Sequence, residues 1–160
     1  LDSYCFEGKS ILTGGRRYSF NNNGQLNLFI NCHTTEGRHD FVTGAKVCGP
    51  NAFVNCTAKN THGDTGPHHR WAMGTLYDNI VTDGEINVRD RGNSGSGHGW
   101  AGVNQVLWNC KVWVIGLQGK KVDNSFKLGE RPDGEWEGLN KANLQPSSLY
   151  YAQLKAKTNH

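Results

Sequence analysis

Long apolar runs are missing from this chain of 160 residues, and a membrane-spanning helix would need ~20 such residues in a row. Charged and apolar residues are also scarce, at 19% and 36%, whereas there are 21 glycines. This composition disfavours a helical bundle, which is rich in Ala, Leu, Glu and Lys. It favours one domain of many short strands, joined by turns in which Gly and Asn adopt positive φ.

A strong net charge and a metal-type cysteine spacing are missing as well. The net charge is +3 and no run of Lys and Arg exceeds two residues, so we predict no nucleic-acid partner and no membrane insertion. The five cysteines form no C-x-x-C pair. Neither a zinc ribbon nor a thioredoxin-type site is therefore indicated.

What the sequence does contain is a repeat. Four segments each have apolar or aromatic residues, then Asn, then Cys or Ile, with the Asn at positions 31, 55, 79 and 109. The spacing is 24, 24 and 30 residues, which indicates successive rungs of a solenoid with one enlarged loop. We predict an all-β fold, a right-handed parallel β-helix (single-stranded solenoid), over residues 1–118.

The recurring Asn and Cys residues have a structural interpretation. Equivalent residues of neighbouring rungs lie about 4.8 Å apart, Asn tolerates the left-handed backbone, and its amide can bond the amides above and below. We predict a buried Asn ladder beside a stack of free thiols and Ile80, with disulfides between stacked thiols as the alternative. The ladder comprises Asn31, Asn55, Asn79 and Asn109 with Cys32, Cys56 and Cys110.

The two ends of the chain differ from the repeat. Residues 119–160 are predicted to form an irregular cap, because the last rung of a solenoid needs a cover. Within it, Pro146 and Ser147 mark the start of a short helix near residues 147–156, with an apolar stripe at Leu149, Tyr150 and Leu154. The first residues already read as strand. We expect further rungs before them, or another chain over that face.

A second pattern of ring, variable residue and aromatic residue also recurs. Its ring positions are Tyr18, His39, His69 and His98, spaced by 21, 30 and 29 residues. Its aromatic positions are Phe20, Phe41, Trp71 and Trp100. Because each occurrence precedes an Asn of the first repeat, we predict at least two strands per rung, with the ring residues stacked in a column.

The segments that carry this second pattern resemble a known family. The strings Gly66-Pro67-His68-His69-Arg70-Trp71 and Gly95-Ser96-Gly97-His98-Gly99-Trp100 look like the C-terminal half of secreted bacterial pectate-lyase-like β-helix proteins. The closing residues 148–154 are similar to the end of the same group. The resemblance spans roughly residues 10–155 and implies an extracellular or cell-surface protein that faces carbohydrate, without implying one reaction.

Side-chain alternation predicts a basic strip along the second set of strands. If the aromatic residues point inward, Arg17, Arg38 and His68 face solvent, together with Ser19, Asp40 and Arg70. Arginine forms two bonds to a carboxylate, so the strip suits an acidic, uronate-containing polysaccharide. A bulge would instead turn the His residues outward.

The His column has two interpretations. It is either a buried stack of neutral imidazoles or a surface column that binds substrate or a metal. We predict no metal site, because no carboxylate is placed as a fourth ligand. Only Asp40 and Asp64 lie near the strip, so Ca²⁺, which many pectate lyases use, is only weakly indicated.

The leading functional hypothesis is β-elimination from a polyuronate. Arg38 and Arg70 would neutralise the carboxylate, His68 or His39 would take the proton, and Arg91 or Tyr18 would assist the leaving oxygen. The predicted catalytic residues are Arg38, His39, Asp40, His68, His69 and Arg70. The predicted substrate contacts are Arg17, Tyr18, Asp64, Arg89, Arg91, Asn93, His98 and Trp100.

Two other functions stay open at this point. A glycoside hydrolase needs two carboxyl groups across the scissile bond, and Glu36, Asp40 and Asp64 are the candidates. Their basic surroundings would lower their pKa values and oppose a general acid. A non-catalytic module, such as an adhesin-type or structural part of an extracellular assembly, needs only the fold.

Overall fold

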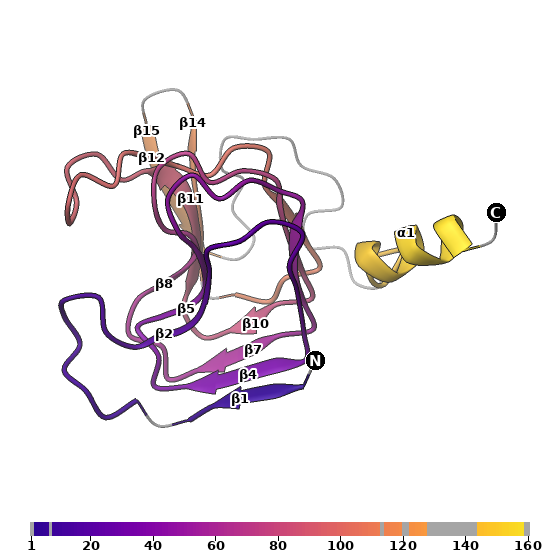
Figure 1. The fold of residues 1–160 in the computed structure, drawn as a ribbon, viewed down its shortest axis with the longest axis horizontal. Coiled ribbons are helices and arrows are strands. Elements are labelled where there is room, and N and C mark those ends of the chain that lie inside the picture. Colours follow the sequence, from indigo (N-terminus) through magenta and orange to yellow (C-terminus); the bar gives the residue numbers. More distant parts are fainter. Residues whose placement is uncertain (1, 7, 113, 120–121, 128–143, 159–160) are drawn as a thin grey trace.

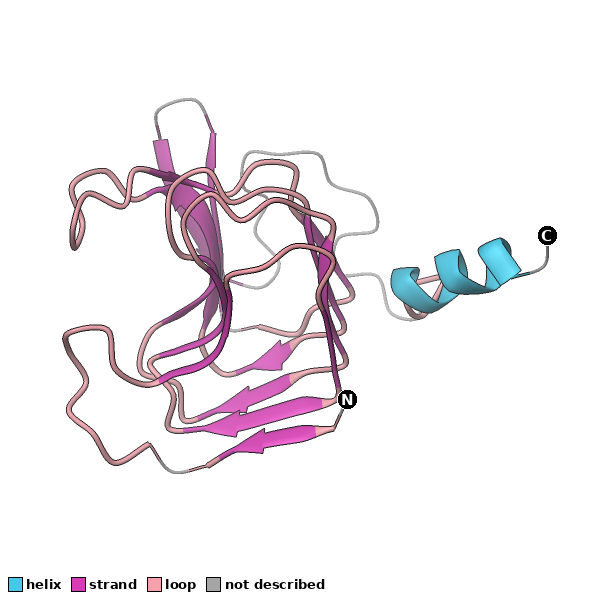
Figure 2. Cartoon of the chain, in the orientation of Figure 1, coloured by secondary structure: helices cyan, strands magenta, loops and turns pink. Residues whose placement is uncertain are grey.

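Short strands make up most of the described chain. The computed structural model describes residues 2–6, 8–112, 114–119, 122–127 and 144–158. Figures 1 and 2 show the strands gathered in one body and a single helix, α1 (Leu149–Thr158), at its side. The all-β prediction with a short C-terminal helix is thereby confirmed. Within these residues, no helix has the length and apolar character required to cross a membrane.

The strands lie in three sheets, which we call sheets A, B and C. Sheet A contains β1 (Ser3–Cys5), β4 (Cys32–Thr35), β7 (Thr57–Lys59) and β10 (Val81–Thr82). Sheet B contains β2 (Tyr18–Asn22), β5 (His39–Thr43), β8 (Asp64–Pro67), β11 (Glu85–Asp90), β14 (Val114–Gly119) and β15 (Val122–Lys127), with β12 (Trp100–Ala101) beside β11. Sheet C contains β3 (Leu28–Ile30), β6 (Asn51–Val54), β9 (Thr75–Asp78) and β13 (Val106–Trp108).

From β1 to β11, consecutive strands enter different sheets, so the chain returns to each sheet after one strand in each of the other two. The pairings along sheet A, along sheet C and from β2 to β14 are parallel. The strands β12 and β15 pair antiparallel with β11 and β14. Parallel pairing places equivalent ends of successive strands side by side, which brings residues far apart in sequence to one edge.

The first repeat sets the register of sheet C as predicted. Leu28 pairs with Ala52, Ala52 with Leu76, and Leu76 with Val106, at the 24-, 24- and 30-residue offsets of the repeat. All four repeat Asn residues have φ between 49° and 56°. They are half-buried, not buried as expected.

The amides of these four Asn residues do not form one continuous ladder. The Asn79 amide donates to the Asn55 side-chain oxygen at 3.1 Å. The Asn31 amide donates to Asp2 at 2.8 Å, and that of Asn109 to the Ser147 carbonyl at 2.9 Å. The two outer members are therefore satisfied by residues outside the repeat.

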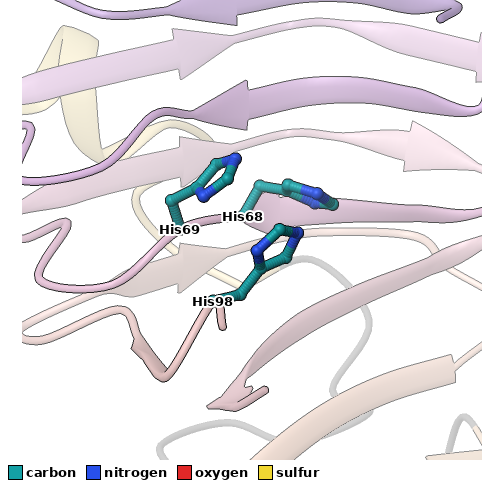
Figure 3. A group of neighbouring side chains, drawn as sticks. All are labelled: His68, His69 and His98. Carbon is teal, nitrogen blue, oxygen red and sulfur yellow. The ribbon is translucent and has the colours of Figure 1, made fainter. Parts of the chain in front are cut away.

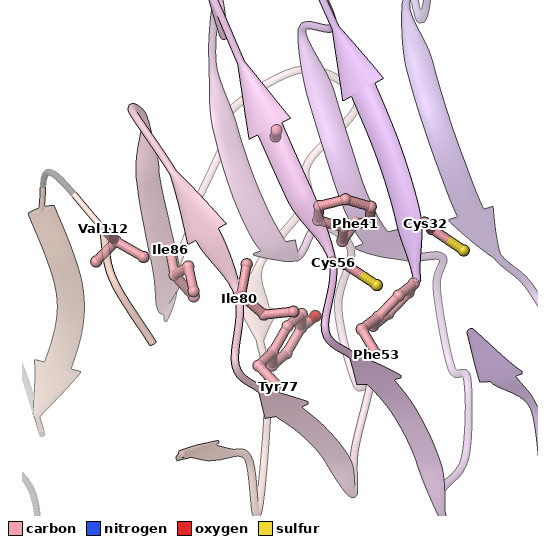
Figure 4. Packing of buried hydrophobic residues seen from close by; sticks show 9 residues of the cluster. Cys32, Phe41, Phe53, Cys56, Tyr77, Ile80, Ile86 and Val112 are labelled. Carbon is pink, nitrogen blue, oxygen red and sulfur yellow. The ribbon is translucent and has the colours of Figure 1, made fainter. Parts of the chain in front are cut away.

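The core lies between the sheets and is built from aligned residues of successive strands (Figure 4). The rings of Phe29 and Phe53 stack at 4.7 Å, and those of Phe53 and Tyr77 at 5.5 Å. Stacked rings of this kind add to the apolar area that they bury. The aromatic positions of the first repeat therefore line the interior.

The cysteines are all free. Cys32 and Cys56 are buried in the core with Ile80, and Cys110 packs against this cluster. Burial raises the pKa of the Cys56 and Cys110 thiols to about 12. These thiols therefore act as small apolar groups at neutral pH.

The second predicted column is broken between His39 and His69, although the rings of its last pair, His69 and His98, lie together with centroids 4.2 Å apart. Tyr18 does pair with His39. However, β5 and β8 pair Val42 with Gly66, an offset of 24 residues, so His39 does not lie opposite His69. The loops that follow the strands of sheet B differ in length. The ring pattern therefore aligned His39, which lies in a strand, with His69 and His98, which lie in loops.

The two tryptophans of that pattern lie outside the core. Trp71 has a φ of 63° in a turn and is 56% exposed. Trp100 lies in β12, antiparallel to β11. A turn and an antiparallel strand do not continue a parallel stack.

The C-terminal region is partly more regular than expected. β15 lies in the segment predicted as irregular and pairs with the free edge of β14. Residues 120–121 and 128–143 of that predicted cap lie outside the described residues. The helix was expected near residues 147–156 and is found at Leu149–Thr158.

A buried carboxylate anchors the start of this helix to sheet C. Asp78, at the end of β9, accepts hydrogen bonds from the Ser148 hydroxyl at 2.7 Å and from the Tyr150 amide at 2.8 Å. Ser148 also caps the helix, because its hydroxyl accepts from the Tyr151 amide. An anion at the first turn is favoured by the helix dipole.

We predict that replacing Asp78 by Ala loosens the helix. The change removes two hydrogen bonds to a charged acceptor, and a loss of about 2 kcal/mol in docking is expected. Hydrogen exchange of the amides of residues 149–158 should accelerate roughly 10-fold or more. The matched control is Asp83→Ala, which removes an exposed carboxylate bonded to Asn60 and Thr61. Equal exchange in both variants would contradict the assignment.

Candidate functional site

A pocket of about 350 Å³ opens beside sheet B. Two glycines and a tight loop form part of its wall. The polar side chains that line it are Tyr18, Arg38, His68, His69, Arg91 and His98. Gly14 and Gly15 were not predicted as site residues, although a glycine pair in a loop before a strand is a detectable signal.

Parallel pairing explains why these residues meet. Tyr18 is the first residue of β2 and lies opposite His39, the first residue of β5. Asp64 is the first residue of β8, and His68 follows its last residue. Arg91 follows the last residue of β11. The site therefore collects side chains from four strands of sheet B, from the starts of β2, β5 and β8 and from just beyond the ends of β8 and β11.

The loop between β11 and β12 brings the last histidine to the pocket. The Arg91 amide bonds the Gly99 carbonyl, and the His98 amide bonds the Ser94 carbonyl at 3.0 Å. Gly95 has a φ of 57°, and a side chain there would collide with the His98 imidazole. The glycine is thus required for the turn and for the close approach of the ring.

The centre of the site is a buried ion pair. Both terminal nitrogens of the Arg91 guanidinium, Nη1 and Nη2, contact the Asp64 carboxylate. His39 Nδ1 lies 2.8 Å from Asp64 Oδ1. Asp64 is only 6% exposed and His39 only 4%. Burial acts to raise the pKa of Asp64, but the hydrogen bond from His39 and the charge of Arg91 outweigh it and lower this pKa well below its usual value.

Next to this ion pair, a tyrosine is hydrogen-bonded to a histidine. The Tyr18 hydroxyl lies 2.8 Å from His68 Nε2. Burial and the nearby Arg91 charge lower the pKa of His68 to about 3, so the imidazole is neutral at neutral pH. Burial raises the pKa of Tyr18, against the opposing charges of Arg38 and Arg91. The phenol is therefore protonated and donates to His68.

Three imidazoles gather at the mouth of the pocket (Figure 3). The ring centroids of His69 and His98 are 4.2 Å apart, and those of His68 and His98 are 4.9 Å apart. Burial lowers the pKa of His69 and of His98, with Arg70 adding to the first and His69 to the second. Two groups have metal-ligand spacing: this trio, and His39 with Asp64 and His68.

The arginines of the predicted strip have different roles. Arg17 donates to the carbonyls of Ser10 and Glu36, and Arg70 donates to the Gly97 carbonyl at 2.7 Å. Neither lines the pocket. Arg38 does line it, and no hydrogen bond or ion pair of its guanidinium is found among the described residues. Arg38 is thus the uncommitted cation of the site.

Asp40 does not face solvent, which corrects the predicted strip. It is 1% exposed and accepts hydrogen bonds from the Ser19 and Thr34 hydroxyls. Its neighbour Phe41 is buried in the core. Both side chains are thus buried, because residues on both faces of β5 are covered. Burial raises the pKa of Asp40, against the two hydroxyl bonds.

Three further predicted contacts lie away from the pocket lining. They are Arg89, Asn93 and Trp100. Arg89 and Trp100 belong to the antiparallel pair of β11 and β12. Asn93 is exposed in the loop that follows. Their nearness in sequence to Arg91 and His98 made them candidates, but the pairing of β11 with β12 separates them from the pocket.

In comparison with known proteins, no family model matches the sequence, and no curated protein or solved structure gives a significant match.

Proposed function

We propose that this chain is a right-handed parallel β-helix protein of the pectate-lyase-like type that cleaves an acidic polysaccharide by β-elimination. The return of the chain to each of three parallel sheets supports this fold. The observation that carries the reaction is the Tyr18–His68 pair beside the uncommitted Arg38 in one pocket. An extracellular or cell-surface location is part of the proposal and follows from the resemblance.

Arg38 is the group that receives the uronate carboxylate. Its charge is available, whereas Arg91 is paired with Asp64 and Arg70 is bonded to a carbonyl. A guanidinium bonded to the carboxylate withdraws its charge and makes the adjacent C5 proton more acidic. The buried Asp64–Arg91 ion pair forms a rigid part of the site, next to which the sugar binds.

Tyr18 and His68 form the proton relay. Tyr18 Oη takes the C5 proton while its own proton passes to His68 Nε2 across the 2.8 Å contact. The C4–O bond then breaks, the C4=C5 double bond forms, and the leaving oxygen takes a proton back through Tyr18. His68 is a weak base, so carboxylate neutralisation by Arg38 must supply much of the driving force.

The positions of the carboxylates disfavour hydrolysis. Asp40 is buried behind two hydroxyl groups, and Asp64 is held by His39 and Arg91. Glu36 is bonded to His62 at 2.6 Å and lies away from the pocket lining. Among the described residues that line the pocket there is no Asp or Glu, whereas a glycosidase needs two carboxyl groups at its site.

The experiment compares Arg38→Ala with the unmodified protein on polygalacturonate, alginate, hyaluronate and heparan sulfate. Product formation is followed through the ultraviolet absorbance of the unsaturated uronate. Loss of a charge-assisted hydrogen bond worth about 1.5–3 kcal/mol should lower kcat/KM roughly 10- to 100-fold on the best substrate. Arg38→Lys should recover part of the loss.

Two controls separate recognition of the carboxylate from damage to the fold. Arg16→Ala removes an exposed arginine bonded to the Thr13 carbonyl and should leave kcat/KM unchanged. Methyl esterification of the polymer should remove the difference between Arg38→Ala and the unmodified protein. Binding without any eliminated product would instead favour the non-catalytic module.

A further inference from the structure

The three pocket histidines converge on one another, and the proposed elimination uses only His68. His68 and His69 follow β8, and His98 comes from the loop before β12 (Figure 3). Each ring offers a nitrogen within 4.8 Å of the nitrogens of the other two. Imidazole nitrogens that converge in this way form a common site for zinc and related metals.

Two of these imidazoles contain buried nitrogens without a partner. His68 is only 3% exposed, and its Nδ1 has no hydrogen bond. Its Nε2 is already bonded to the Tyr18 hydroxyl, so Nδ1 is the nitrogen left for a ligand. The Nδ1 of His98 is likewise buried without a partner. Buried polar atoms without partners are rare and call for an explanation, such as a bound ion.

We propose that His68, His69 and His98 bind one divalent transition-metal ion of the zinc class, with the remaining position open to water. Three imidazoles without a carboxylate suit Zn²⁺, Co²⁺ or Ni²⁺ and do not suit Ca²⁺, which takes oxygen ligands. In this metal-bound state His68 Nε2 carries the proton and donates it to the Tyr18 oxygen, so this state differs from the metal-free one, in which Nε2 accepts the Tyr18 proton. A hydrogen bond of this kind orients a metal-bound imidazole.

Two of the three arginine charges near the trio are already engaged, whereas Arg38 lines the same pocket and opposes a cation there. The Arg91 charge is compensated by Asp64, and Arg70 is exposed with its guanidinium on the Gly97 carbonyl. The other group with metal-ligand spacing is less suited, because both Asp64 oxygens are already contacted by His39 or Arg91. The trio is therefore the better site of the two.

The test is calorimetric titration of the full chain with ZnCl₂ and CoCl₂, without any polysaccharide. Because exposed Cys5 and Cys48 could also bind zinc, all measurements use the Cys5→Ser/Cys48→Ser background. We expect one metal ion to bind per chain. When Co²⁺ is the bound ion, we expect the visible absorption that is typical of Co²⁺ with a low coordination number. Removing a ligand in His69→Ala or His98→Ala should weaken binding roughly 10- to 100-fold or more.

The matched control is His62→Ala, which removes an exposed histidine paired with Glu36 and should leave metal affinity unchanged. His69 and His98 are only half-buried, so their variants are expected to fold, and circular dichroism checks this. No binding, or binding that survives both substitutions, would overturn the proposal. Because no substrate is present, its failure is distinct from failure of the proposed elimination.

Discussion

Replacing Asp64 by Asn should lower the free energy of unfolding by roughly 3–5 kcal/mol, the largest stability effect expected in this chain. The carboxylate is the counter-charge of the buried Arg91 guanidinium and a hydrogen-bond partner of His39. An Asn at this position leaves Arg91 charged and unpaired in a site where water is excluded. Urea unfolding at neutral pH, followed by circular dichroism, measures the difference.

The pH dependence of this difference has a defined sign. The pKa of Asp64 is lowered in the folded protein, so its stabilising contribution is fully present above the unfolded pKa of about 3.9. It is lost as the pH falls below that value toward the folded pKa. The gap between the unmodified protein and Asp64→Asn should therefore be constant from about pH 8 to 5 and shrink below about pH 4.

The control for this prediction is Glu36→Gln. This residue also lies next to a histidine, at 2.6 Å, but the pair is exposed to solvent. Exposed ion pairs contribute little to stability, so unfolding should hardly change. If Asp64→Asn were no more destabilising than Glu36→Gln, the ion pair would not be the organising element of the pocket.

Replacing Tyr18 by Phe should lower kcat on the best polyuronate by roughly 10²- to 10⁴-fold, with a small effect on KM. The substitution keeps the ring that packs against His39, at a centroid distance of 4.8 Å. It removes the hydroxyl that is bonded to His68 and that relays the proton. Initial rates from the absorbance of the unsaturated product give both constants.

A second tyrosine provides a matched comparison. Tyr77 is fully buried in the core, and its hydroxyl has no hydrogen-bond partner. Tyr77→Phe removes this unsatisfied group, so stability should be unchanged or slightly higher and kcat unaffected. A Tyr18→Phe variant that kept kcat within a few-fold of the unmodified protein would exclude Tyr18 from the proton relay.

The sequence predicts the part of the fold in which strand spacing is regular. The 24-residue spacing of Asn55 and Asn79 recurs in the register of sheet C. The Asn residues take up the left-handed backbone, and the Cys56 thiol is buried in the core. These features follow from local chemistry repeated at a constant interval, so the sequence alone is enough to predict them.

The candidate site is harder to predict because its contacts cross loops of unequal length. Asp64 and Arg91 are 27 residues apart and meet only through the parallel pairing of β8 with β11. The ring pattern aligned His69 with His39, but the strand pairing does not place these two residues opposite each other. Asp40 looked exposed, because alternation does not predict that both faces of β5 are covered.

The most direct test of the central claim is the mass of the oligosaccharides released from the best polyuronate by the unmodified protein. Elimination transfers no water, so one product of each cleavage carries a C4=C5 double bond and is lighter by one water than a hydrolysis product. We predict this unsaturated species, and we predict that Arg38→Ala and Tyr18→Phe suppress it. Saturated products with an added water, or no cleavage of any polyuronate, would contradict the proposed function.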